Sequence, residues 1–102
     1  MTTVVNIKHC ADFDPKSNIN DVYIGRFHKS KYGFYPRSKW HNPFKIGEDG
    51  TREEVLKMYR NYILTSADLL LSLKELKGKR LGCWCKPEGC HGDILVELVD
   101  QL

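Results

Sequence analysis

Residues 83–93 concentrate the side chains of this sequence that could do chemistry. The segment holds three of the four cysteines and one of the four histidines. A thiol near the N-terminus of a helix has a lowered pKa and reacts faster at neutral pH, and a neighbouring imidazole can act as its base. We therefore expect a catalytic group of Cys90, His91 and Asp93. The two glycines of the segment would let backbone amides approach an anionic ligand.

Two other interpretations of this segment stay open. In the first, the segment binds zinc, because thiolates and imidazole are preferred ligands of this metal. The ligands would be Cys83, Cys85, Cys90 and His91. Their spacing is unlike that of structural zinc sites, so zinc is the less favoured cofactor, and the sequence identifies no other. In the second, the cysteines are buried as small apolar side chains, and the histidine and aspartate only cap a helix.

A second feature is the basic and aromatic segment over residues 26–45. It contains six basic residues, no acidic residue and six of the eleven aromatic residues, although the whole chain has a net charge of only +3. Basic residues interleaved with aromatic ones suit phosphate attraction and base stacking. We expect Arg26 to bind phosphate and Trp40 to stack on a base. The alternative is a long loop whose aromatic side chains pack on the core while its lysines stay in solvent.

The hydrophobic pattern predicts the strands that would position these residues. Short runs rich in β-branched and aromatic residues predict strands over residues 4–7, 21–24 and 80–84, and residues 26–45 are expected to be a loop. Since side chains alternate along a strand, the last strand should turn Cys83 and Cys85 to one face of the sheet. Trp84 should then face the opposite layer.

Three helices are expected between and after the strands. Thr51 and Glu54 form a capping box that begins the first helix, and apolar residues then recur on one face of that helix. Arg52 opposes the dipole at this helix start, which suggests an anionic contact. Two more helices are predicted over residues 67–76 and 93–101. A chain of 102 residues is one domain. We therefore expect a single small Rossmann-like α/β domain over residues 1–102, with a short, mostly parallel sheet of three or four strands and about three helices.

The carboxyl edge of such a sheet is where a ligand should bind. In open parallel sheets, ligands bind where the strand ends lead into loops and helix N-termini. The three predicted strands end just before Cys10, Arg26 and the segment that holds His91. We therefore expect these three side chains to converge on one pocket.

Four motifs in order along the chain carry a resemblance to a known family. They are DVYIGR at residues 21–26, SKWHNPF at 38–44, GTREE at 50–54, and CWC followed by CHGD within 83–93. Over nearly its whole length the chain resembles the bacterial and phage family catalogued as domain of unknown function 4326. The resemblance implies no established activity. It implies as polar members of the site Asn6, Arg26, Asn42, Arg52, Cys90, His91 and Asp93. The end of the chain is also similar to a second uncharacterised α/β family, whose last strand leads into a Cys-His-Arg helix start, and this supports a Rossmann-like architecture.

Together these observations predict a protein that binds a nucleotide or a nucleic-acid-derived phosphate ligand. The prediction extends to processing of this ligand, but whether the protein catalyses a reaction is left open. One alternative is a non-enzymatic phage or bacterial interaction protein that binds nucleic acid or a host protein through residues 26–45. The other is a small zinc-stabilised module. The longest uninterrupted apolar run has three leucines, and the N-terminus lacks a secretory pattern. We therefore expect no membrane partner and a cytoplasmic location, in the host cytoplasm if a phage encodes the chain.

Overall fold

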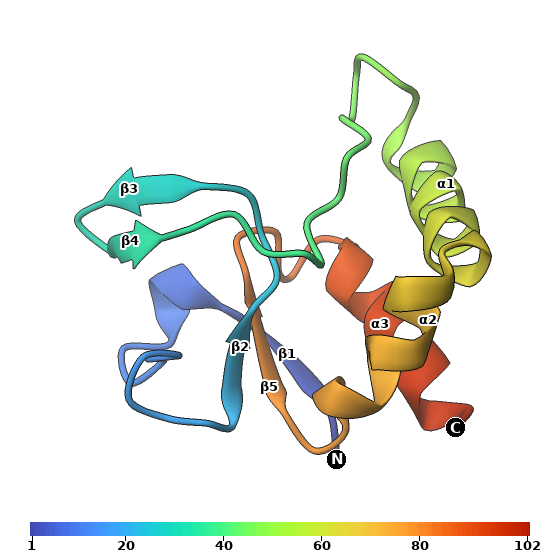
Figure 1. Cartoon of the computed structure of the whole chain (residues 1–102). Helices are drawn as coiled ribbons and strands as arrows, with labels where there is room; N and C mark the ends of the chain where they lie inside the picture. Colours follow the sequence, from blue (N-terminus) through green and yellow to red (C-terminus); the bar gives the residue numbers. More distant parts are fainter.

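A parallel three-stranded sheet forms the centre of the computed structural model, which describes residues 1–102. Its strands are β1 (Thr3–Asn6), β2 (Asp21–Tyr23) and β5 (Arg80–Cys83), in the order β1-β5-β2 (Figure 1). The central strand β5 pairs in parallel with both neighbours, and β1 and β2 do not pair with each other. The three predicted strands are confirmed, and each ends one residue earlier than expected.

A separate hairpin follows β2 where a loop was expected. Its strands β3 (His28–Ser30) and β4 (Gly33–Tyr35) pair antiparallel. Gly33 has a φ of 130°, a left-handed conformation that glycine adopts without strain. The strands have three residues each, so their sequence carries little alternation from which to predict them. The prediction of a loop over residues 26–45 is therefore wrong for the hairpin.

The helices follow the expected order. They are α1 (Arg52–Thr65), α2 (Ala67–Ser72) and α3 (His91–Asp100), with the 3-10 turns η1 (Ile7–His9) and η2 (Leu73–Leu76). The predicted capping box of α1 is confirmed, because Thr51 and Glu54 each accept a hydrogen bond from the other's backbone N–H. The helix α3 begins two residues earlier than expected, because Cys90 is its N-cap. No helix is both long and apolar enough to cross a membrane.

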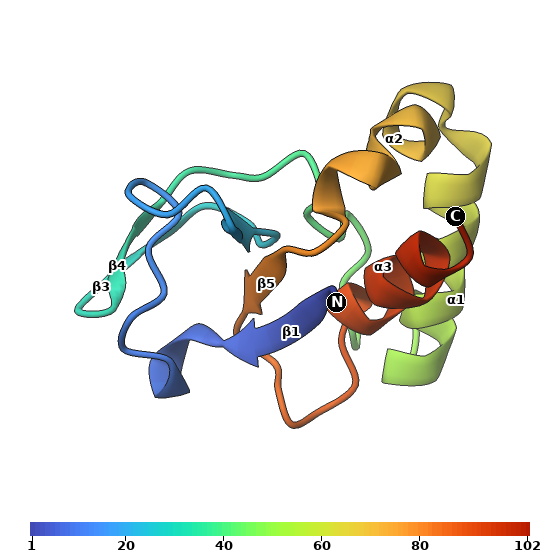
Figure 2. The ribbon, with the colours of Figure 1, turned by 90° about the horizontal axis from the view of Figure 1, so that it is seen from below.

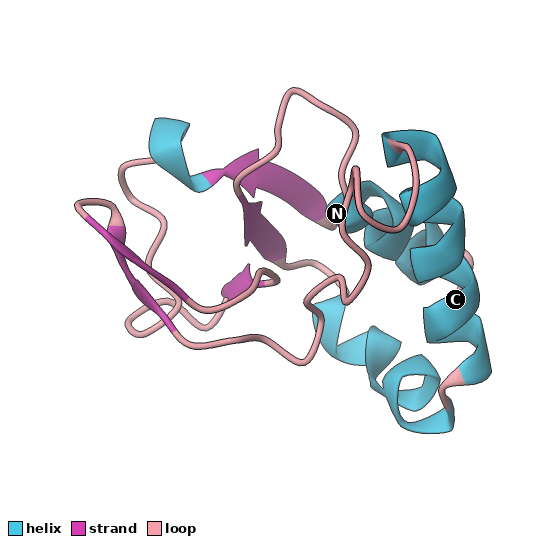
Figure 3. Ribbon diagram, turned by 90° about the horizontal axis from the view of Figure 1, so that it is seen from above, coloured by secondary structure: helices cyan, strands magenta, loops and turns pink.

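The two faces of the sheet carry different layers. The three helices cover one face, and the hairpin with the loop after η1 covers the other (Figure 2, Figure 3). The larger core lies on the helix side and includes Cys83, with Cys85 packed against it. The smaller core on the hairpin side includes Tyr23 and Tyr35, with Trp84 packed against it. The predicted alternation of the two cysteines and the tryptophan is confirmed, and the fold is a small α/β domain.

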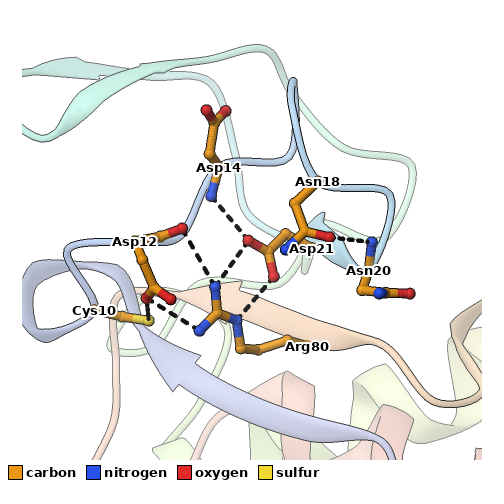
Figure 4. A network of polar contacts seen from close by, with 7 residues as sticks. All are labelled: Cys10, Asp12, Asp14, Asn18, Asn20, Asp21 and Arg80. Carbon is orange, nitrogen blue, oxygen red and sulfur yellow. Dashed lines mark hydrogen bonds and ion pairs between the residues drawn. The ribbon is translucent and has the colours of Figure 1, made fainter.

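The three strands end at one edge of the sheet, as expected, but Cys10 does not lie there. The turn η1 redirects the chain after β1, and Cys10 Sγ donates a hydrogen bond to Asp12 Oδ1 at 3.3 Å. Asp12 in turn pairs with Arg80, the first residue of β5 (Figure 4). Cys10 therefore belongs to a polar network at the amino end of the central strand. The expected convergence is wrong for Cys10 and confirmed for Arg26 and His91, which line one cavity.

Candidate functional site

A cavity of about 510 Å³ opens at the carboxyl edge of the sheet. It lies where the ends of β2 and β5 meet the first turns of α1, the loop around residues 42–48 and the loop before α3. Five of the residues expected in the site line it: Arg26, Asn42, Arg52, Cys90 and His91. A volume in this range suits a small organic ligand.

Two arginines from different elements give the cavity a positive charge. Arg26 follows β2, and its Nη2 donates to the carbonyl oxygens of Asn42 at 2.7 Å and Phe44 at 3.1 Å. Arg52 opens α1, and its Nη1 donates to the Gly89 carbonyl oxygen at 2.6 Å. Neither arginine is paired with a carboxylate, and the acidic group beside Arg52 is the Cys85 thiol. These two contacts also hold the flanking loops against the strand ends.

Three thiols meet beside these arginines. Cys90 Sγ donates a hydrogen bond to Cys83 Sγ at 3.3 Å, and Cys85 packs against the core cluster that holds both of these residues. Cys83 and Cys90 are fully buried, whereas Cys85 is half-buried. The neighbouring Cys90 thiol, helped by the guanidinium of Arg52, lowers the pKa of the Cys85 thiol to about 6 although burial opposes this. The bond from Cys90 also lowers the pKa of Cys83, to about 7, so Cys85 is the most acidic of the three thiols.

Cys90 has the opposite character to the one expected of it. Its pKa is raised, first because its proton is held in hydrogen bonds to Cys83 and Cys85, and also because the group is buried. The argument from the helix N-terminus is outweighed by these neighbours. The prediction of Cys90 as the activated nucleophile is thus not supported by the geometry, and the activated position is Cys85.

His91 lines the cavity but is not paired with a cysteine. Its Nε2 lies 2.6 Å from the Ile24 carbonyl oxygen. A carbonyl can only accept, so this nitrogen carries the proton and the ring is held in one tautomer. Burial lowers the pKa of His91, which keeps the ring neutral at neutral pH. A role as the base of Cys90 does not follow from this arrangement.

Asp93 lies outside the cavity and serves the start of α3. Its Oδ2 accepts from the Cys90 backbone N–H at 3.1 Å, and its Oδ1 forms an ion pair with Lys86. The Gly92 N–H donates to Cys90 Sγ at 3.2 Å. These bonds occupy backbone donors that an anion was expected to use. Asp93 therefore has the geometry of a helix-capping residue, as in the interpretation in which this aspartate only caps the last helix.

Two further expected residues have structural positions. Asn6 Nδ2 donates to the Lys86 carbonyl oxygen at 2.6 Å and so ties the loop after β5 to the end of β1. Trp40 is only 2% exposed and packs in the larger core, where its carbonyl accepts a hydrogen bond from the Tyr59 hydroxyl at 2.7 Å. A buried ring cannot stack on a base, so the expected role of Trp40 is wrong.

The four residues of the zinc interpretation are close in space but are not arranged as a metal site. The chain forms no group of three or more histidine, cysteine or acidic side chains with the geometry to hold a metal ion. The protonated Nε2 of His91 is committed to Ile24, and the Cys90 proton is shared with its neighbouring thiols. Such protons have to leave before these atoms can ligate a metal.

The cavity also contains residues that sequence reasoning did not place there. Trp84 lines it and stacks on the His28 ring, with ring centroids 4.0 Å apart. Phe27 and Phe44 line it from the basic and aromatic segment. Cys85 was considered as a metal ligand or as a buried apolar side chain. Its place two residues after Cys83, just beyond the strand end, was the signal that could have found it.

Comparison with known proteins gives a family but no activity. The family described as Domain of unknown function (DUF4326) matches residues 5–101. The chain is 43% identical over 86 residues to an uncharacterised protein of Acanthamoeba polyphaga mimivirus, covering 76% of this chain and 65% of that protein. It is 37% identical over 62 residues to an uncharacterised 12.4 kDa protein of Enterobacteria phage T4, covering 56% of this chain and 57% of that protein. The chain thus matches less than two thirds of the length of either relative. No solved structure matches it.

Proposed function

This chain belongs to the DUF4326 family, and we propose that its cavity binds a nucleotide or another phosphate-bearing fragment of nucleic acid. The observation that carries the proposal is the presence of two arginines without a carboxylate partner and of an aromatic wall in one cavity at the carboxyl edge of a parallel sheet. Processing of the ligand would be a further step after binding. The Rossmann-like class and the cytoplasmic location stay predictions.

The position and size of the cavity support a small ligand. The carboxyl edge is where open parallel sheets bind nucleotides and related compounds. The volume of about 510 Å³ lies within the range of about 300–1,000 Å³ that is typical of ligand pockets. All helices lie on one face of this sheet, so the likeness to a doubly wound fold is limited to the parallel strands and the site at their ends.

The charges of the cavity favour a phosphate group. Arg26, Lys45 and Arg52 line it together with a single acid, Glu48, which lies 3.8 Å from Lys45. A guanidinium has five N–H donors in a fixed planar arrangement, and it matches a phosphate better than an ammonium does. The known contacts of Arg26 and Arg52 use only part of these donors. The rest can bind phosphate oxygens.

The aromatic side chains supply the second half of a nucleotide site. Trp84, Phe27 and Phe44 line the same cavity as the arginines. Phe27 is 60% exposed, so its ring is accessible to a ligand in the cavity. Stacking of a base on an aromatic ring contributes about 1–3 kcal/mol. This combination favours a nucleotide over inorganic phosphate.

The test is thermal unfolding in the presence of the four nucleoside monophosphates, their nucleosides and inorganic phosphate. A ligand at about 100 times its Kd adds about 2.7 kcal/mol, which raises the Tm of a domain of this size by about 10 °C or more. We expect a rise with at least one nucleotide and a smaller rise with phosphate. Arg52→Met should remove most of the rise, and Lys29→Met, on the hairpin, should not. An equal rise in both variants, or none with any nucleotide, would overturn the proposal.

A second candidate function rests on the hairpin. Phe34 and Tyr32 are 47% and 39% exposed, and Lys16 and Lys31 lie over their rings at 5.7 and 5.3 Å from the centroids. Exposed aromatic rings with cations beside them suit single-stranded nucleic acid. Binding of a labelled oligothymidylate should then weaken steeply with salt, and Phe34→Ala should weaken it while Arg52→Met does not. A flat salt response excludes this function.

A further inference from the structure

The three thiols of the cavity differ in their exposure to solvent, and the binding of a phosphate ligand does not require them. We propose that they undergo thiol–disulfide exchange with the disulfide of a small anionic thiol compound, in which Cys85 makes the first attack and Cys90 completes the exchange. The proposal uses the same cavity as the proposed function but does not depend on the identity of the phosphate ligand.

Accessibility decides which thiol reacts first. Cys83, Cys85 and Cys90 all line the cavity, but Cys83 and Cys90 are only 1% and 2% exposed. Cys85 is half-buried and is therefore the most accessible of the three sulfurs. It packs against the core cluster that holds Cys90. The arrangement therefore has one accessible sulfur with a second, buried sulfur next to it.

The electrostatic surroundings assign the same roles. The Cys90 thiol, Arg52 and Arg26 favour the Cys85 thiolate, whereas a charge on the neighbouring Cys83 opposes it. Cys90 donates its proton in a hydrogen bond to Cys83, and its pKa is raised, so this thiol stays protonated and reacts second. An attacking thiol with a pKa near the ambient pH is the most effective in exchange.

The exchange balances in two steps. The Cys85 thiolate attacks one sulfur of the small disulfide; a bond forms between the two sulfurs, the original disulfide bond breaks, and one small thiolate leaves. Cys90 then loses its proton to solvent and attacks Cys85 Sγ. An intramolecular Cys85–Cys90 disulfide forms, and the second small thiolate leaves and takes up a proton. The protein dithiol is oxidised and the small disulfide is reduced to two thiols.

The charge of the cavity defines the class of substrate. Arg26 and Arg52 flank Cys85 without a carboxylate partner, so a disulfide that carries carboxylates is favoured over a cationic one. Glutathione disulfide is an anionic probe of this class, and cystamine is a cationic disulfide of comparable reactivity. For each disulfide, the rate of its reaction with the protein is divided by the rate of its reaction with free N-acetylcysteine. The ratio isolates the contribution of the cavity.

The experiment follows the full-length chain, initially reduced, by intact mass and peptide mapping at pH 7. We expect glutathione disulfide to react at Cys85 first and then to leave a Cys85–Cys90 disulfide. Cys90→Ser should trap glutathione on Cys85, and Cys85→Ser should abolish the reaction. The normalised rate should be at least about threefold higher for glutathione disulfide than for cystamine, because two cations flank the thiolate. Cys10→Ser is the control and should behave as the unaltered chain.

Alkylation by iodoacetamide is a second measurement, and it does not require Cys90 to react. Iodoacetamide should alkylate Cys85 faster than Cys10, whose pKa is raised by burial and by its hydrogen bond to Asp12. The Cys85 thiolate is the more populated of the two at pH 7, and its lower intrinsic nucleophilicity offsets only part of this advantage, so Cys85 should be labelled several-fold faster. Equal labelling of Cys10 and Cys85, or a Cys90→Ser variant that accumulates no mixed disulfide, would overturn the proposal. Neither result bears on the thermal test of nucleotide binding.

Discussion

The central strand β5 has an arginine and a cysteine near each of its ends, and the two surroundings are opposite. At its amino end, Arg80 binds the carboxylates of Asp21 and Asp12, and Cys10 donates to Asp12 (Figure 4). At its carboxyl end, Arg52 meets only a backbone carbonyl and the Cys85 thiol. The pKa of Cys10 is raised, and that of Cys85 is lowered.

The comparison shows that the surroundings of a thiol, rather than the residue types beside it, decide its charge. Burial and the hydrogen bond to Asp12 keep the proton on Cys10. The Cys90 thiol and then Arg52, which has no carboxylate partner, favour the thiolate of Cys85.

Removing the carboxylate at the amino end should have the largest effect. The Asp21 side chain is 1% exposed and accepts two hydrogen bonds from Arg80, at 2.8 and 2.9 Å. Asp21→Asn removes the buried carboxylate and leaves the partly buried guanidinium with only the exposed Asp12, and we expect a loss of about 3 kcal/mol of unfolding free energy in urea. Lys39→Met is the matched control, because the Lys39–Glu75 pair is half exposed, and should cost about 0.5 kcal/mol or less. Similar losses in both variants would contradict the structural role of this network.

The same network predicts a dependence of stability on pH. Hydrogen bonds from Arg80 lower the pKa of Asp21 in the folded chain, although burial opposes this. Its stabilisation is therefore complete above the unfolded pKa of about 3.9 and is lost as the pH falls through the lower folded pKa. The difference in unfolding free energy between the unaltered chain and Asp21→Asn should be constant from pH 7 to 5 and shrink below about pH 4. A difference that persists unchanged at pH 2 would contradict this account.

At the carboxyl end, the tie between β1 and the loop after β5 is the next most sensitive point. Asn6→Asp replaces a donor by a carboxylate oxygen that faces the Lys86 carbonyl oxygen. We expect a loss of about 2 kcal/mol in urea unfolding and weaker binding of any cavity ligand. Asn18→Asp is the matched control, because Asn18 uses only its Oδ1, as an acceptor for the Asn20 N–H at 2.9 Å. An aspartate can accept the same bond, so this variant should be close to neutral.

The smallest expected effect concerns the charge beside the reactive thiol. Arg52→Gln removes a cation that favours the Cys85 thiolate, and the rate of alkylation of Cys85 at pH 7 should fall about threefold. Arg60→Gln, on the same helix but paired with Glu97, should leave the rate unchanged. Both rates are measured by quantitative peptide mapping after iodoacetamide treatment. A rate that rises in Arg52→Gln would contradict the assigned role of the cation.

Local patterns predicted the parts of the fold that depend on local physics. The strands, the Thr51–Glu54 capping box and the alternation of Cys83 and Trp84 follow from spacing within a few residues, and the structure confirms them. The hairpin was missed because its strands of three residues depend on packing against the sheet. A short turn redirects the chain after β1, and this placed Cys10 at the wrong edge of the sheet in the prediction.

The sequence predicted the location of the candidate site better than it predicted the roles of the residues in it. The rule that parallel strands end at one edge predicted that Arg26 and His91 share one cavity. Trp40 was misassigned because burial depends on the packing of the whole domain, and Cys90 because the hydrogen bonding among the thiols of residues 83–90 depends on the shape of the loop. The lowered pKa of Cys85 also depends on Arg52, which contacts it from another part of the chain.

The strand order also determines when the sheet can assemble. β1 and β2 pair only with β5, which is the last strand of the chain. During synthesis neither early strand has a partner until residues 80–83 have left the ribosome. A fragment that stops before Arg80 would thus hold β1 and β2 without a partner, with the β3–β4 hairpin as its only paired strands. Closing the long loop from β1 to β5 should also make folding slow for a domain of this size.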